Sequence, residues 1–167
     1  SILVDEPANV IQGARREADA HPYGILLVDD EEAILESLEF TLGEDYRVFT
    51  ATNGRDGLAI LDREEIALVI VDQVMPEMSG VEFLERVIER QPRTIRMMLT
   101  GYADVQSIVR AINDGRIYRY IQKPWEPDEL RLDVKRALES YHLTAENAQL
   151  AAALAEANER LRAENLY

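Results

Sequence analysis

Apolar residues in this chain gather into short runs, and the segments between the runs repeat with a longer period. The run Ile66–Val71 is apolar throughout, which is typical of a strand covered on both faces. Four further short runs lie before and after it along the chain. We expect strands at Ile25–Val28, Tyr46–Thr50, Ile66–Val71, Arg96–Leu99 and Ile117–Ile121.

Between these runs, apolar residues recur at the three- and four-residue steps of an amphipathic helix. Start and stop signals agree with this spacing. Asn53 suits the N-cap of the second helix, and Ser79 with Glu82 forms a capping box for the third. Gly115 suits the end of the fourth helix and Pro127 the first turn of the last one. This alternation of strands and helices predicts an α/β fold with a doubly wound parallel sheet.

The last helix is expected to be unusually long. After Pro127, no proline or glycine interrupts it before about Ala163, whereas an ordinary closing helix has roughly 12 residues. In the C-terminal part of this helix, a set of mostly apolar residues recurs at alternating steps of four and three residues. This spacing is typical of the seam of a coiled coil. The seam residues are Leu143, Asn147, Leu150, Leu154, Ala157 and Leu161.

This seam predicts a parallel homodimer, because a buried pair of Asn147 side chains would fix its register and orientation. Ala151 and Ala153 occupy flanking positions where salt bridges ordinarily add specificity. The dimer is therefore expected to be weak or conditional. The alternative is a single amphipathic helix that packs on a further domain.

The chain divides into four expected parts. Residues 1–23 form an N-terminal extension, in which Ala8–Ala20 is compatible with a short helix of obscure role. Residues 24–140 hold the alternating domain, and residues 141–163 form the coiled-coil linker helix, continuous with the domain's last helix. Residues 164–167 resemble the start of an engineered protease-cleavage tag, so we expect the natural chain to continue beyond this point.

The composition limits which cellular compartment and which classes of binding partner we expect. Of the 167 residues, 47% are apolar, which suits a globular domain with an appendage. The lack of cysteine excludes a disulfide scaffold, cysteine-based zinc sites and thiol catalysis. A net charge of −14 opposes binding to nucleic acid or anionic membrane, and no apolar run approaches the roughly 20 residues of a membrane span. We expect a cytoplasmic protein that binds neither.

The candidate chemistry lies where four of the expected strands end. Asp29 and Asp30 follow the first strand, Asp72 the third, Thr100 the fourth and Lys123 the fifth. In a doubly wound sheet these ends share the edge where ligands bind. Carboxylates about 4 Å apart repel one another by several kcal/mol at an intermediate dielectric, so a cation must offset them. Lys123 and a bound Mg²⁺ are the candidates.

Four segments resemble the signature segments of receiver domains of two-component response regulators. They lie in family order at family-like intervals, and are Ile25–Glu31, Val71–Gly80, Met98–Asp104 and Tyr120–Pro124. The resemblance covers residues 24 to about 140 and implies a flavodoxin-like sheet of strand order 2-1-3-4-5. Trp125 after Lys-Pro, together with Asn113–Tyr120, is similar to receivers of hydrogenase-regulating transcription activators and of HD-GYP-type regulators.

The resemblance implies that Asp72 accepts a phosphoryl group from a sensor histidine kinase. It also implies a Mg²⁺ site made by Asp29, Asp30, Asp72 and the backbone carbonyl of Val74. Lys123 and Thr100 would contact phosphoryl oxygens, Thr100 and Tyr120 would form the switch, and the Lys123–Pro124 peptide bond would be cis. Such a chain is not itself an enzyme. It is expected to pass the change through its C-terminal helix to a transcription activator or a cyclic-di-nucleotide enzyme.

Other interpretations remain at this stage. Taken alone, Asp29 and Asp30 also suit a helix start, and Tyr120 also suits plain packing. A phosphohydrolase with an aspartyl nucleophile would need a second aspartate two residues after Asp72, where Val74 cannot move a proton. A receiver that serves as a phosphorylation-independent dimerisation scaffold is the alternative function.

Val74 and Tyr102 occupy two positions that, in the receiver family, modulate how fast water removes the phosphate. Neither residue is acidic or amide-bearing here. We therefore predict slower dephosphorylation than in regulators with a polar residue at the Val74 position. The lifetime of the aspartyl phosphate in wild type and in Val74→Asn would test this, and equal lifetimes would contradict it.

Overall fold

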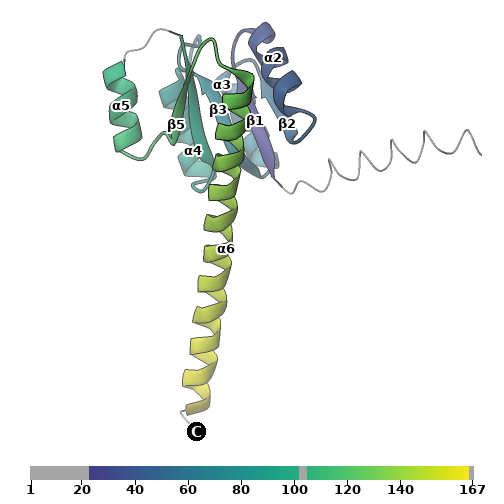
Figure 1. Ribbon diagram of the computed structural model, residues 1–167. Coiled ribbons are helices and arrows are strands. Elements are labelled where there is room, and N and C mark those ends of the chain that lie inside the picture. Colours follow the sequence, from purple (N-terminus) through teal and green to yellow (C-terminus); the bar gives the residue numbers. More distant parts are fainter. Residues whose placement is uncertain (1–22, 102–104, 166–167) are drawn as a thin grey trace, which may run out of the picture.

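A computed structural model describes residues 23–101 and 105–165 of the chain (Figure 1). In this part, strands and helices alternate as β1 (Gly24–Val28), α2 (Glu32–Leu42), β2 (Arg47–Ala51), α3 (Gly54–Arg63), β3 (Ile66–Asp72), α4 (Gly80–Arg90), β4 (Ile95–Thr100), α5 (Val105–Asn113), β5 (Arg119–Gln122) and α6 (Pro127–Asn165). All neighbouring strands are parallel, in the order β2-β1-β3-β4-β5. The expected doubly wound flavodoxin-like fold is confirmed. The expectations for Ala8–Ala20 and Tyr102 lie outside the described residues.

The sheet is buried on both faces, as the unbroken apolar run of β3 predicts. All seven residues of β3 are buried. Helices α3 and α4 cover one face, where Phe83 is fully buried. Helices α2 and α6 cover the other face, where Leu38 and Val134 are fully buried (Figure 1). Each face thus has its own apolar core, and the strand ends are left free to carry polar groups.

Local signals set most helix ends where the sequence predicts them. The Asn53 side chain accepts a hydrogen bond from the Asp56 amide at 2.8 Å, and the Ser79 hydroxyl accepts one from the Glu82 amide at 3.2 Å. Each bond satisfies an amide that has no partner within the first helical turn. Pro127 is the first residue of α6. The predicted caps at Asn53 and Ser79 and the place of Pro127 are confirmed; the return bond from the Glu82 side chain that would complete a capping box stays a prediction.

The fifth strand begins later than predicted. We expected it to start at Ile117, but β5 begins at Arg119. The amides of Arg116 and Ile117 both donate to the carbonyl of Ala111, at 2.9 and 3.2 Å. Gly115 precedes them with φ of +74°, a conformation that glycine adopts without strain. The turn that closes α5 therefore holds Ile117 out of the sheet.

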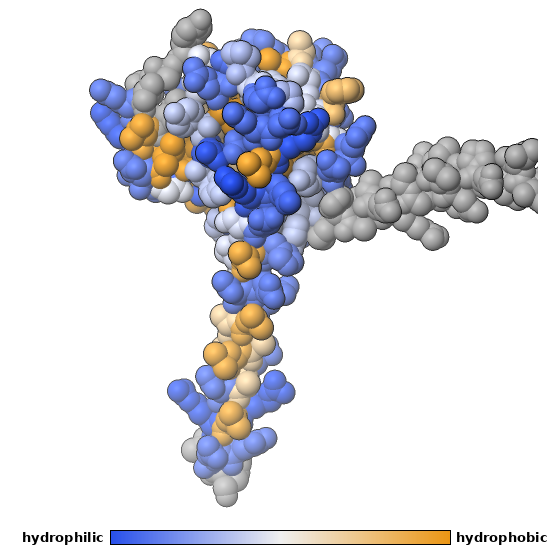
Figure 2. All heavy atoms as spheres, viewed as in Figure 1, coloured by the Kyte–Doolittle hydropathy of each residue, from blue (hydrophilic) through white to orange (hydrophobic). Residues whose placement is uncertain are grey.

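Helix α6 runs along the sheet and then leaves the domain as a stem (Figure 1). Its last buried residue is Tyr141, whose hydroxyl donates to Glu65 at 3.0 Å. Beyond that point, Leu143, Leu150 and Leu161 are 56–61% exposed, and Figure 2 shows apolar side chains along the stem. The seam residues are thus open to solvent in one chain, and the coiled coil stays a prediction. Among the described helices, none combines the length and apolarity that a bilayer span requires.

The connection from β3 to α4 packs closely beneath Asp72. The Gly80 amide donates to the Gln73 carbonyl at 3.0 Å. A Cβ atom at Gly80 would lie 2.5 Å from the Asp72 carbonyl oxygen, closer than real Cβ contacts come. Only glycine allows this approach, so Gly80 helps to set the position of Asp72 at the end of β3.

We predict that Gly80→Ala destabilises the protein by about 1–3 kcal/mol, the usual cost of forcing extra atoms into a packed site. Gly101→Ala is the matched control, because a Cβ atom there meets nothing within 4 Å. Urea unfolding of both variants measures the difference. Equal stabilities would contradict the close approach.

Candidate functional site

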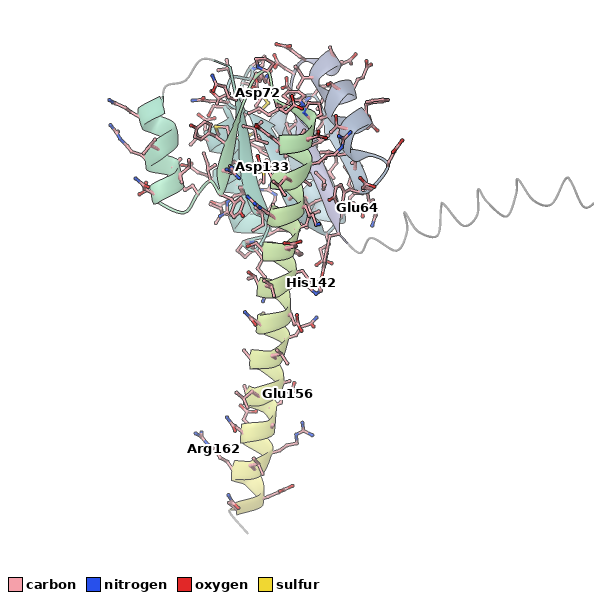
Figure 3. All side chains as sticks on the ribbon, viewed as in Figure 1. Glu64, Asp72, Asp133, His142, Glu156 and Arg162 are labelled. Atoms are coloured by element: carbon pink, nitrogen blue, oxygen red, sulfur yellow. The ribbon has the colours of Figure 1, made fainter. Side chains whose placement is uncertain are left out.

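Three carboxylates lie together at the carboxyl edge of the sheet. Val28 of β1 pairs with Val71 of β3, so the residues that follow them, Asp29 and Asp72, come side by side. Asp29 is fully buried, Asp72 is 8% exposed and Asp30 is exposed. Oxygen atoms from the three carboxylates lie within 4.8 Å of one another. The structure thus gathers the three predicted acids into one cluster at the edge labelled by Asp72 in Figure 3.

Lys123 brings a positive charge to this cluster from the end of β5. Its ammonium nitrogen Nζ lies 3.0 Å from Asp72 Oδ1 and 3.1 Å from Asp29 Oδ2. Its backbone amide donates to the Thr100 carbonyl at 2.8 Å, and its peptide bond to Pro124 is cis. The side chain is 19% exposed, which limits screening of both ion pairs by water. One cation from the end of β5 therefore meets carboxylates at the ends of the neighbouring strands β1 and β3, from which β4 separates it in the sheet.

Burial and charge act in opposite directions at this site. Burial raises the pKa of Asp72, the Lys123 hydrogen bond lowers it, Asp29 raises it again, and the outcome is a pKa above its ordinary value of 3.8. Burial lowers the pKa of Lys123, but its hydrogen bonds to Asp72 and Asp29 outweigh burial and raise it. Lys123 thus stays charged at neutral pH. The ionised form of Asp72 is destabilised by burial and by the negative charge of Asp29.

The cluster fits a small divalent cation. Carboxylate oxygens are the hard ligands that Mg²⁺ prefers, and this ion keeps several waters when only a few protein ligands reach it. Asp30 opens the cluster to solvent, which leaves room for such waters. The side chain of Val74 is 78% exposed, two residues beyond Asp72. The residues present therefore fit the magnesium site that the sequence predicts.

The two residues of the expected switch lie in different surroundings. Thr100 ends β4 and is 3% exposed; its neighbour Leu99 pairs with Asp72 of β3. Tyr120 lies on β5 and is 43% exposed. It opens onto a hollow of about 660 Å³ between β5 and α6, here called the β5–α6 cavity. Six of the residues that line it are Tyr118, Tyr120, Trp125, Glu126, Glu129 and Asp133.

One ion pair at this cavity has no signature in the sequence. Arg119 of β5 donates to Asp133 of α6 at 2.5 Å, and Figure 3 labels Asp133 on the helix. The pair spans a turn between a strand and a helix, so no helical or strand spacing marks it.

Comparisons with known proteins agree with this geometry. The family model of the response regulator receiver domain matches residues 25–135. The hydrogenase transcriptional regulatory protein HoxA of Cupriavidus necator is 39% identical over 126 residues, and HoxA of Bradyrhizobium diazoefficiens is 42% identical over 122 residues. The matches cover 75% and 73% of this chain but 26% and 25% of the relatives, so the chain spans about a quarter of their length.

Solved structures give the same result. The signal receiver domain of an HD domain-containing protein from Pseudomonas fluorescens Pf-5 has a TM-score of 0.70 at 39% identity, over 75% of this chain and 93% of that one. A structure described as adenylate cyclase from Rhodopirellula baltica has a TM-score of 0.75 at 28% identity, over 77% and 96%. The resemblance drawn from the four sequence segments is confirmed.

The raised pKa of Asp72 leads to a stability prediction. A folded-state pKa above the unfolded one makes the ionised group unfavourable for folding, fully so above the raised pKa. Asp72→Asn should therefore stabilise the metal-free protein at pH 7. Removing one like-charge contact is worth roughly 1 kcal/mol, or about 2–4 °C in Tm for a chain of this size.

Thermal unfolding in a chelator measures this difference. The gap between wild type and Asp72→Asn should close as the pH falls toward 3.8, because wild type then becomes neutral at residue 72 as well. An Asp72→Asn protein that melts below wild type at pH 7 would contradict the prediction.

Proposed function

The chain belongs to the response regulator receiver domain family, and from that premise we propose that it is a phosphorylation-dependent signalling switch. Asp72 is the phosphoryl acceptor and a sensor histidine kinase is the donor. The observation that carries the proposal is the ion-paired cluster: a nearly buried Asp72 with Lys123 at 3.0 Å and two further carboxylates within 4.8 Å. A carboxylate with only a structural role does not call for such crowding.

In the proposed reaction, an oxygen of the Asp72 carboxylate attacks the phosphorus of a phosphohistidine. The new P–O bond gives an acyl phosphate, and the P–N bond breaks with its electron pair going to the imidazole. Phosphoryl transfer depends mainly on positioning and on neutralising charge. The buried edge holds the Asp72 side chain in place, and Lys123, already 3.0 Å from it, pairs with a phosphoryl oxygen.

Asp29, Asp30 and Asp72 would hold Mg²⁺, with the Val74 backbone carbonyl as a further ligand. When bound, the ion neutralises charge on the phosphoryl oxygens. The fit of three carboxylates within 4.8 Å supports this assignment. An incoming phosphoryl group adds negative charge to the three carboxylates. The single ammonium group of Lys123 does not balance that total, so a second cation is needed.

The response to phosphorylation runs through Thr100 and Tyr120. The Thr100 hydroxyl would bond to a phosphoryl oxygen, and Tyr120 would turn inward from its half-exposed position beside the β5–α6 cavity. Such a change shifts a pre-existing equilibrium between two conformations. Helix α6 would carry the shift out of the domain, with pairing along the seam from Leu143 to Leu161 as the dimer contact.

The relatives suggest which kind of activity this receiver domain would control. The HoxA proteins and the regulatory protein AtoC of Escherichia coli, which is 34% identical over 131 residues, are named as transcriptional or regulatory proteins. This chain spans about a quarter of their length, so the DNA-directed activity would belong to a part that it does not cover. We favour a transcription activator over a cyclic-di-nucleotide enzyme as the output.

The test is direct phosphorylation. With acetyl phosphate and Mg²⁺, wild type should gain the mass of one phosphoryl group, mapped by peptide analysis to Asp72. Asp72→Asn should gain none, and Lys123→Met should be slowed by roughly a hundredfold or more, the usual effect of removing a charge-stabilising group. Asp128→Asn, a surface carboxylate on α6, is the matched control and should react like wild type.

Two results would overturn the proposal. One is a phosphoryl group that maps away from residue 72. The other is equal labelling of wild type and Asp72→Asn. If labelling of Asp72 is unchanged in the presence of a chelator, the proposed Mg²⁺ requirement is wrong, while Asp72 remains the proposed phosphoryl acceptor.

A further inference from the structure

A second hollow lies where α6 leaves the domain, and we call it the stem groove. Its volume is about 600 Å³, and its apolar walls are Tyr23 before β1, Tyr46 before β2, and Leu138 and Leu143 of α6. Tyr46 and Leu138 are half-buried at the edge of the core that α2 and α6 form against the sheet, whereas Leu143 is 59% exposed. The groove therefore continues this core out to the surface of the domain.

Tyr23 attaches the chain that precedes β1 to this groove. Its hydroxyl oxygen lies 3.1 Å from Nδ1 of His142, which also lines the groove. Its ring meets the ring of Tyr141 edge-on, with the ring centroids 4.9 Å apart. Figure 3 labels His142 on α6, just below the domain. Residues 1–22 therefore join the described part of the chain at the wall of the groove.

The sequence before Tyr23 has an apolar face that fits this groove. In a helix over residues 8–20, which the sequence permits, four apolar residues would share one face. They are Val10, Ile11, Ala14 and Ala18. The opposite face would carry polar residues, among them Asn9, Gln12 and Arg16. Packing of the apolar face into the groove would remove apolar surface of both partners from water.

The rim of the groove and the segment have complementary charges. Lys135 and Glu139 of α6 line the groove and are exposed. The run Arg15–Glu17 offers both signs of charge next to the apolar face. Ion pairs at an exposed rim add little affinity, but they favour one orientation of the bound segment over the reverse.

The link between the segment and the groove is very short. Only His21 and Pro22 stand between residue 20 and Tyr23. A short link gives two tethered partners an effective concentration on the order of mM, so a contact too weak to form between separate molecules is still populated within one chain. A second copy would need a comparable concentration to compete. The connectivity therefore favours the segment of the same chain as the occupant.

We propose that the stem groove is the docking site of residues 8–20 of the same chain, whose apolar face covers Leu138 and Leu143. Tyr141 is the last buried residue of α6, and the docked segment adds a contact just beyond it, at Leu143. The segment thus braces the stem where it leaves the domain. This role does not depend on phosphorylation of Asp72.

Engineered cysteine pairs test the docking, because the chain has no cysteine of its own. Ala14→Cys places a thiol on the apolar face of the segment, and Leu143→Cys places one in the groove. The control pair combines Ala14→Cys with Thr144→Cys. Thr144 is the next residue of α6 and lines a different hollow, beside Ile117. The two pairs have nearly the same reach along the chain and differ in the side of α6 that carries the thiol.

In a glutathione redox buffer, we expect the groove pair to form a disulfide within one chain. Its effective thiol concentration should be at least about tenfold above that of the control pair, because burying two apolar side chains is worth more than this factor. The bond needs Cα atoms about 4.4–6.8 Å apart, which a docked segment provides. Mass spectrometry of the monomer measures the oxidised fraction.

Two double substitutions separate the apolar contact from the tether. Val10→Asp/Ile11→Asp puts two charges into the apolar face and should lower the effective concentration of the groove pair to that of the control pair. Asn9→Asp/Gln12→Asp adds the same charge to the opposite face and should leave it unchanged.

The brace has a readout of its own, in chains without cysteine. Amide hydrogen exchange of α6 around Leu143 should be faster in Val10→Asp/Ile11→Asp than in wild type, because the contact that protects this turn is lost. Equal exchange in the two proteins would contradict the brace.

Three results would overturn the docking. One is equal oxidation of the groove pair and the control pair. Another is the same effect from both double substitutions. The third is oxidation of the groove pair mainly between chains, rising with protein concentration, which would assign the groove to the segment of a second copy.

Discussion

The ion pairs of Lys123 with Asp29 and Asp72 are the interaction on which the site depends. Two carboxylates on neighbouring central strands are taken almost out of water, a change that costs free energy unless a charge partner meets them. Lys123 supplies that partner from the far end of β5. The fold must therefore hold β1, β3 and β5 in fixed register at one edge, and the two apolar cores on either face of the sheet do so.

The parts of this arrangement that could be predicted from sequence are those with a local cause. A fully apolar run identifies β3, and parallel strands present their carboxyl ends at one edge of the sheet. The sequence alone therefore places Asp29, Asp72 and Lys123 together. Asn53 and Ser79 mark helix starts because the side chain that caps a helix lies in the same segment.

What could not be predicted depends on contacts between distant segments. The late start of β5 follows from how the turn after α5 uses the Ala111 carbonyl, which no hydrophobic pattern records. The Arg119–Asp133 pair and the bridging of two aspartates by one lysine depend on side-chain conformations that packing selects. The sequence supplied the kinds of group at the edge, and tertiary structure decided which atoms meet.

The fixing of α6 at Tyr141 has a mechanical consequence. The hydroxyl bond from Tyr141 to Glu65 ties the helix to the edge of the sheet opposite the acidic cluster, and about 36 Å of helix projects beyond it. A rigid helix that leaves the domain at this point converts a small tilt into a large displacement of its free end. Tilting by about 5° at this fulcrum moves the far tip by roughly 3 Å, two residues' worth of helical rise. A rearrangement too slight to disturb the cores would still be large at the end of the stem.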